Sequence, residues 1–72
     1  MNTKREFKDI LNNFLKENNF TQTQFATIID VKQSQVSEWL HGKAKPGYDL
    51  LKTMSKKFGI SADFWLGIID EY

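Results

Sequence analysis

Apolar residues recur over the first part of the chain at the spacing of one helix face. They lie three or four positions apart, and they are Phe7, Ile10, Leu11, Phe14 and Leu15. Because residues at this spacing share one side of an α-helix, the pattern predicts an amphipathic helix. We expect it to stop at Asn18 and Asn19, since Asn tolerates the left-handed backbone that ends many helices.

A short helix is predicted next, beginning at a capping box. Thr21 can accept a hydrogen bond from the amide three residues on, and Gln24 can reach back to the Thr21 amide. The expected inner face consists of Phe25, Ala26 and Ile29. We expect this helix to end at Asp30, because Asp is one of the few side chains that adopt a positive backbone angle.

A second short helix is predicted over residues 33–41, after a bend at Val31. Its inner face consists of Val36, Trp39 and Leu40, and Gly42 stands where a terminating glycine belongs. Isolated helices of this length are marginal in water. Both short helices therefore need the rest of the chain as a scaffold.

The remaining apolar positions predict two more helices after a loop over residues 42–47, which is rich in Gly and Pro. The fourth helix is marked by Leu50, Leu51, Met54 and Phe58, and it ends at Gly59. Ser61 caps a fifth, whose apolar residues are Phe64, Trp65, Leu66, Ile68 and Ile69. We place Phe64 and Leu66 in the core. With no alternation typical of strands, the fold class predicted is all-α.

The length of 72 residues predicts one domain over residues 1–72, with its core at about 7–67 and a short acidic tail. A domain this small has little room for a substrate pocket. It also has no Cys, a single His and no glycine-rich phosphate loop, so we expect neither an enzyme nor a metal or cofactor site. No apolar run predicts a membrane span or a secretory signal, and we expect a cytoplasmic location.

Charge is distributed unevenly along the chain, although the net charge is only +1. Residues 32–57 contain six lysines against Glu38 and Asp49, whereas residues 59–72 contain three acidic residues and no basic one. A basic segment is typical of a surface that meets nucleic acid.

The outer face of the helix at 33–41 carries the candidate chemistry. Its side chains are short or medium polar groups rather than the usual mixture of Lys and Glu, and they include Gln33, Ser34, Gln35, Ser37 and Glu38. Gln can pair with the edge of adenine through two hydrogen bonds, and Ser can donate or accept. Lys32 and Lys43 flank this face, where they would meet phosphates. On periodicity alone, an ordinary solvated face fits equally well.

The chain resembles the Cro/repressor type of helix-turn-helix domain. The matching segments are Phe20-Thr21-Gln22-Thr23-Gln24-Phe25-Ala26, Asp30-Val31, Val36-Ser37-Glu38-Trp39-Leu40-His41-Gly42-Lys43, Pro46 and Ile60-Ser61-Ala62-Asp63-Phe64-Trp65-Leu66-Gly67. The resemblance implies a compact, five-helix, lambda-repressor-like DNA-binding domain, with the helix-turn-helix formed by its second and third helices. The helix at 33–41 would then enter the major groove of double-stranded DNA.

The resemblance also implies roles for single residues. Base contacts would come from Gln33, Ser34, Ser37 and Glu38. A contact to the DNA backbone would come from Gln22, and Lys43 lies in the loop that commonly approaches the backbone. Lys32 and Lys45 are further candidates for backbone contacts by their position and charge, apart from the resemblance. The sequence departs from the family pattern at Asp30, where a glycine is usual, and at Lys32, where Ser or Thr is usual.

The predicted function is a sequence-specific transcriptional regulator of the phage or bacterial Cro–repressor type, which binds an operator. The alternative is an antirepressor of the same fold, which binds a cognate phage repressor instead of DNA. Glu38, Lys32 at the cap position and the low net charge favour the alternative, whereas the basic middle segment favours DNA.

The end of the chain has more apolar residues than one terminal helix needs for a small core. We therefore predict that Trp65, with Ile68 or Ile69, forms a surface for a homodimer or another partner.

Overall fold

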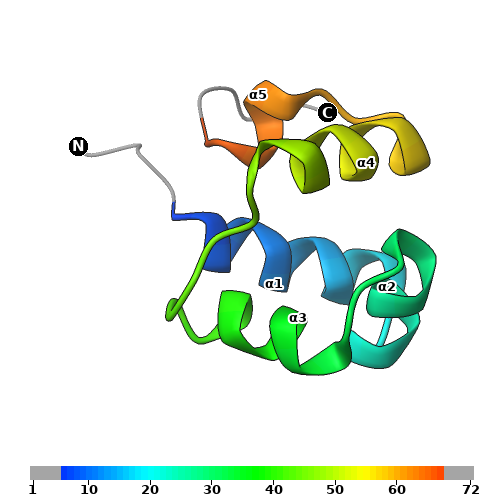
Figure 1. Cartoon of the computed structure of the whole chain (residues 1–72), viewed down its shortest axis with the longest axis vertical. Helices are drawn as coiled ribbons and strands as arrows, with labels where there is room; N and C mark the ends of the chain where they lie inside the picture. Colours follow the sequence, from blue (N-terminus) through cyan, green and yellow to red (C-terminus); the bar gives the residue numbers. More distant parts are fainter. Residues whose placement is uncertain (1–5, 68–72) are drawn as a thin grey trace.

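The amphipathic stretches of the sequence fold as helices in the computed structural model, which describes residues 6–67. The five helices are α1 (Phe7–Asn18), α2 (Gln22–Ile29), α3 (Gln33–Leu40), α4 (Tyr48–Phe58) and α5 (Ala62–Trp65) (Figure 1). The described residues contain no strand. The all-α, five-helix prediction is confirmed, although α5 has only four residues.

α1, α2 and α4 end where the sequence predicts, because the residue after each helix accepts a left-handed backbone. Asn19 has a φ of 57° at the end of α1, and Asp30 has a φ of 62° at the end of α2. The predicted capping box at the start of α2 is also present. The Gln24 amide donates to Thr21 Oγ1 over 3.0 Å, and the Thr21 amide donates to Gln24 Oε1 over 2.9 Å.

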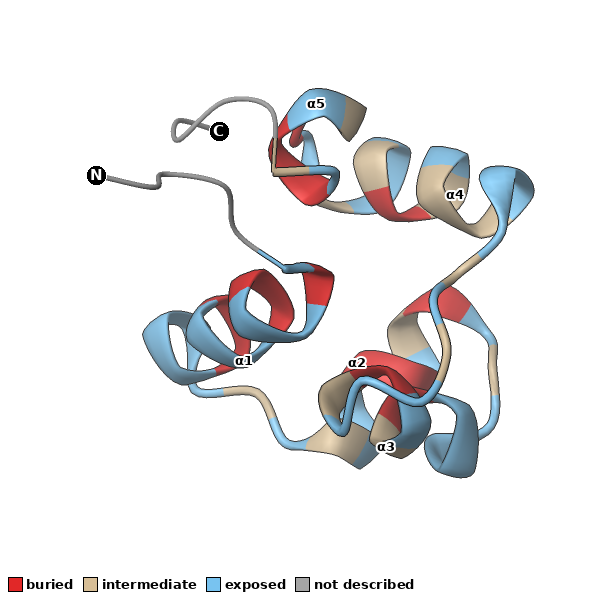
Figure 2. Cartoon of the chain, turned by 90° about the vertical axis from the view of Figure 1, so that its left-hand side faces the viewer, coloured by how far each residue is buried: buried red, intermediate tan, exposed pale blue. Residues whose placement is uncertain are grey.

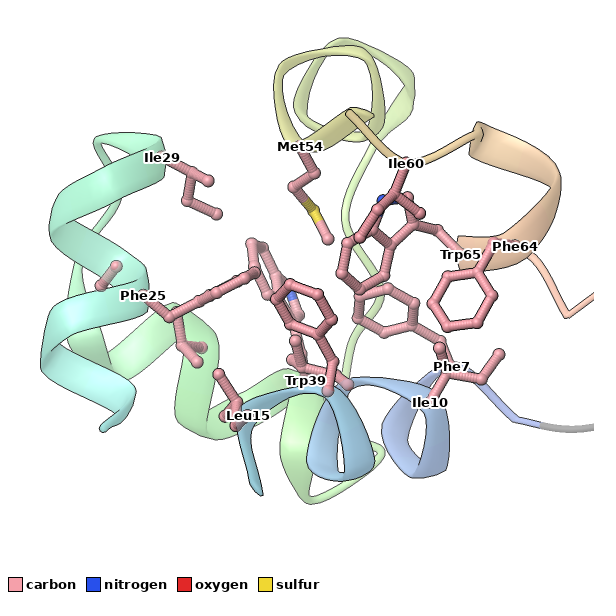
Figure 3. Packing of buried hydrophobic residues seen from close by; sticks show 14 residues of the cluster. Phe7, Ile10, Leu15, Phe25, Ile29, Trp39, Met54, Ile60, Phe64 and Trp65 are labelled. Carbon is pink, nitrogen blue, oxygen red and sulfur yellow. The ribbon is translucent and has the colours of Figure 1, made fainter. Parts of the chain in front are cut away.

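Aromatic rings fill the centre of the molecule. The Phe14 and Trp65 rings meet edge to face with their centroids 5.0 Å apart, and the Phe25 and Phe58 rings stack at 5.4 Å. Figure 3 shows side chains of α1, α4 and α5 converging on this interior. The buried hydrophobic residues are Phe7, Ile10, Leu11, Phe14, Leu15, Phe25, Ala26, Ile29, Val36, Trp39, Met54, Ile60, Phe64 and Trp65.

Two predictions for the end of the chain are wrong. Trp65 is completely buried, because its ring packs among those of Phe7, Phe14 and Phe64, so it cannot form a partner surface. Leu66, which we placed in the core, is 54% exposed, because it follows the last residue of α5 and does not lie on the buried face of that helix. Ile68 and Ile69, predicted to share the partner surface, lie outside the described residues.

The packing of the helices leaves one side of α3 uncovered. α3 packs against α1 and α2, whereas α4 packs against α2 and α5 on the other side of the molecule (Figure 1). Figure 2 shows the buried residues turned toward the middle and the exposed residues turned outward. None of the helices within residues 6–67 has the length and apolar character needed to cross a membrane.

Candidate nucleic-acid interface

The two faces of α3 differ sharply in burial. Val36 and Trp39 are buried, and the Trp39 ring meets the Phe7 ring of α1 nearly perpendicularly with centroids 6.1 Å apart. The predicted base-contact residues lie on the other face: Gln33, Ser34 and Glu38 are exposed, and Ser37 is partly exposed. The inner anchors fix the orientation of the helix, so the outer side chains form a defined polar surface.

The turn between α2 and α3 is held by backbone hydrogen bonds and a small side chain. The left-handed conformation of Asp30 lets the Val31 amide donate to the Ala26 carbonyl oxygen over 2.9 Å. Ala26 itself is buried, and it belongs to α2, which packs against α3. A larger side chain there would overpack the interior and displace the helices around it.

A hydrogen bond joins the first residues of α2 and α3. Gln33 Nε2 donates to Gln22 Oε1, which connects two of the predicted DNA contacts. Each glutamine amide can make four hydrogen bonds, so Gln33 retains a second N–H and its oxygen. The hydrogen bond therefore orients the Gln33 amide, and the remaining N–H and the oxygen can still bind another group.

Lys32 begins α3 without capping it through its side chain. Its ammonium group has no acceptor atom, and the helix start is instead stabilised by the Lys32 amide, which donates to Gln35 Oε1 over 3.2 Å. The Lys32 side chain is exposed. Its charge thus stands at the N-terminal end of the polar face.

The other end of α3 is closed by Gly42, which has a φ of 75°. His41 Nδ1 lies 2.7 Å from the Ser37 carbonyl oxygen, so the nitrogen carries a hydrogen and donates it. The Lys43 amide donates to the Glu38 carbonyl oxygen over 2.9 Å, and its side chain is exposed. Lys43 therefore stands at the C-terminal end of the same face.

Two charged residues of the α1 start lie beside the loop after α3. Lys45 Nζ is 4.0 Å from Glu6 Oε1, and both side chains are exposed, so the pair contributes little stability. Lys8 runs past Gly42: a β-carbon at Gly42 would lie 3.1 Å from Lys8 Cδ. Lys8 was not among the predicted contacts, because its approach joins residues 34 positions apart and local sequence carries no signal for it.

The structure thus brings some predicted site residues together and separates others. Gln22 contacts Gln33, and Lys32 and Lys43 lie at opposite ends of α3. Lys45 belongs to the loop beyond α3. Within the part of the chain that the structure describes, no three acidic or histidine side chains are grouped so as to hold a metal ion.

Known proteins match this arrangement. The model of a helix-turn-helix family matches residues 11–65. The HTH-type transcriptional activator BcrR of Enterococcus faecalis is 34% identical over 58 residues, which is 81% of this chain and 28% of that activator. The chain therefore spans little more than a quarter of that relative.

Two solved structures share the fold. A transcriptional regulator from Listeria innocua superposes with a TM-score of 0.81 at 25% identity, covering 96% of this chain and 64% of that one. The DNA-binding domain of the P22 C2 repressor superposes with a TM-score of 0.80 at 22% identity, covering 93% of this chain and 87% of the domain.

Proposed function

The chain belongs to the Cro/C1-type helix-turn-helix family, and on this premise we propose that it is a sequence-specific DNA-binding regulator of transcription. α3 enters the major groove of an operator, and the ends of the helix-turn-helix meet the phosphates. The observation that carries the proposal is the outer face of α3, which is polar and exposed while Val36 and Trp39 fix the helix from inside.

Gln33 is the residue best placed to read a base. Its hydrogen bond to Gln22 holds the amide, and the remaining N–H and oxygen match the donor and acceptor that adenine presents in the major groove. Ser34 and Ser37 supply shorter donors and acceptors beside it. Glu38 accepts a hydrogen bond from the amino group of cytosine, so we expect at least one cytosine in the site.

The lysines position the helix without reading sequence. Lys32 and Lys43 flank α3, and Lys45 follows in the loop, so their charges meet the phosphates on either side of the groove. Lys45 first leaves Glu6, which costs little because both groups are exposed. These contacts make binding salt-dependent.

Selection from a library of random DNA duplexes tests this function. We expect the chain to enrich a short site, and the enriched site to lose affinity when single base pairs are changed. Each mismatch should weaken binding by about 1–3 kcal/mol. A pool that stays random after selection at low salt contradicts the proposal.

A second candidate function is capture of a partner repressor. The exposed carboxylate of Glu38 lies in the polar face of α3, where it would repel a poorly matched phosphate and attract the basic DNA-reading surface of a repressor. In this function α3 covers the partner's DNA-binding surface and relieves repression.

Gel shifts with and without a cognate repressor separate the two functions. A regulator shifts operator DNA on its own, whereas an antirepressor shifts none and releases DNA from the repressor. Glu38→Gln serves as the matched variant, because it removes the charge and keeps the size. If Glu38 binds the partner repressor, the variant should release less DNA from the repressor than the unmodified chain does. Release that is unchanged or stronger would contradict this role of Glu38.

A further inference from the structure

His41 extends the polar face of α3 by one residue beyond the helix. It is the C-cap residue, and its φ of −90° and ψ of 0° keep it in the right-handed helical region. Residues four and seven positions apart share one side of a helix, so His41 lies on the same side as Ser37 and Ser34. The residue is exposed. The only histidine of the chain therefore stands at the edge of the surface that we propose for DNA.

One carbonyl oxygen fixes the orientation of the His41 ring. The Ser37 carbonyl oxygen accepts the His41 backbone amide over 3.1 Å, and it lies 2.7 Å from Nδ1 of the ring. Because a carbonyl oxygen can only accept, Nδ1 carries a hydrogen and donates it. A neutral imidazole has a single N–H. The other ring nitrogen, Nε2, is therefore an acceptor as long as His41 is neutral.

The state of Nε2 decides how His41 responds to DNA. Both polar contacts of the ring within residues 6–67 use Nδ1, which also lies 3.5 Å from Ser37 Oγ, so Nε2 is open to a ligand. Phosphate oxygens are acceptors too, and a neutral Nε2 has no hydrogen to donate to them. A proton on Nε2 supplies the missing donor together with a positive charge, and charge-assisted hydrogen bonds of this kind are the strong ones.

Charged groups of both signs lie at the end of α3 around His41. They are Glu38 on α3, Lys43 after it, Lys8 of α1, which passes beside Gly42, and the pair formed by Glu6 and Lys45. α2, the other helix packed against α3, has no charged residue within its bounds. The carboxylates favour a proton on His41, whereas the ammonium groups oppose it. Bound phosphates add negative charge to this balance and so favour the protonated ring.

We propose that DNA binding by this chain takes up one proton, at His41 Nε2, and therefore strengthens as the pH falls through the range in which histidine titrates. The inference rests on the proposed function. The proton comes from the solvent, and Nε2 donates to the duplex while Nδ1 stays on the Ser37 carbonyl oxygen. A group that holds its proton more tightly in the complex adds affinity at low pH, and this affinity is lost as the pH rises.

Binding titrations at two pH values test the proposal without knowledge of the operator. The probe is a mixed-sequence duplex of about 20 base pairs, or two helical turns, with binding followed by fluorescence anisotropy at low salt. From about pH 8 to about pH 5.5, we expect the affinity of the unmodified chain to rise roughly five- to tenfold, as for a proton held about tenfold more tightly in the complex.

NMR of the unmodified chain identifies the group that takes up the proton. His41 is the only histidine, so its ring signals are assigned without ambiguity. We expect the midpoint of their titration to lie about one pH unit higher when the duplex is bound. An unmoved midpoint overturns the inference, and this measurement needs no variant.

Two variants serve as controls for the binding titrations. His41→Gln keeps an amide that can donate to the Ser37 carbonyl oxygen but takes up no proton, so its affinity should stay nearly constant between the two pH values. Glu38→Gln removes the carboxylate on the same helix, and whatever its affinity for DNA, it should keep the pH dependence. Thermal unfolding at both pH values reports whether each variant is folded.

The outcomes separate the two claims. If the unmodified chain binds DNA equally well at both pH values, the role of His41 is wrong while the proposed function stands. A pH dependence that persists in His41→Gln assigns the proton to another group and also overturns the inference. If the unmodified chain binds no duplex at either pH value, even at low salt, both claims fail.

Discussion

Individual residues on α3 have separable roles in the proposed complex. Gln33 is held by Gln22 and presents hydrogen-bonding atoms to a base edge, whereas Lys43 presents only charge at the end of the helix. A base contact affects some sequences more than others, whereas a phosphate contact affects all of them equally. Substitutions at these two positions should therefore produce different kinds of defect.

We predict that Gln33→Ala changes sequence preference and that Lys43→Ala does not. Gln33→Ala should cost about 1–3 kcal/mol on the preferred site and relax selectivity at one base pair. Lys43→Ala should weaken binding to every duplex and lower the salt slope by about 0.9. Anisotropy titrations with the preferred site and its single-base variants measure both. Wild-type affinity for the preferred site in both variants would contradict the assignment of α3.

At the scale of elements, the turn between α2 and α3 decides whether the site exists. α2 and α3 have eight residues each, too few to persist alone. The turn holds them at a fixed angle through Asp30, whose φ of 62° suits Asp, Asn and Gly but not a β-branched side chain.

Asp30→Val should destabilise the fold, since the left-handed conformation costs an ordinary side chain about 1–2 kcal/mol. Asp30→Asn is the matched control, because Asn keeps the size and tolerates this conformation. Chemical denaturation of the three proteins measures the difference. Equal stability of Asp30→Val and the unmodified chain would show that the turn is not under this constraint.

The sequence predicts the elements well where their signals are local. Thr21 and Gln24 mark the start of α2, and Asn19 and Asp30 mark helix ends, because capping depends on residues within one turn. The sequence does not predict the burial of Trp65. Its neighbours along the chain are mostly apolar, and a helix of four residues is too short to show which face is buried. The approach of Lys8 to Gly42 cannot be predicted from local sequence either, because it depends on how α1 packs against α3.

At the scale of the whole molecule, aromatic side chains make up much of the core of this small domain. Trp65 is completely buried and contacts rings from α1, α2, α4 and α5, so it joins the helix-turn-helix to the rest of the chain. The neighbouring Leu66 is exposed and takes no part in these described ring contacts.

We therefore predict opposite effects at these neighbouring positions. Trp65→Ala should cost about 3–5 kcal/mol, which is a large share of the roughly 4–11 kcal/mol expected for 72 residues. Leu66→Asp should change the stability of the monomer by about 0.5 kcal/mol or less. Thermal unfolding and sedimentation measure the two effects. A large loss for Leu66→Asp, accompanied by a change in mass, would instead assign this end of the chain to a homodimer.

The most direct measurement of the central claim is the change in amide NMR shifts when a duplex carrying the selected site is added. If α3 reads the operator, the largest changes fall on the backbone of residues 32–43 and on the side-chain amide of Gln33, while the amides of α4 change little. Changes confined to α4 and α5, or none at low salt, would contradict the claim that this face of α3 binds DNA.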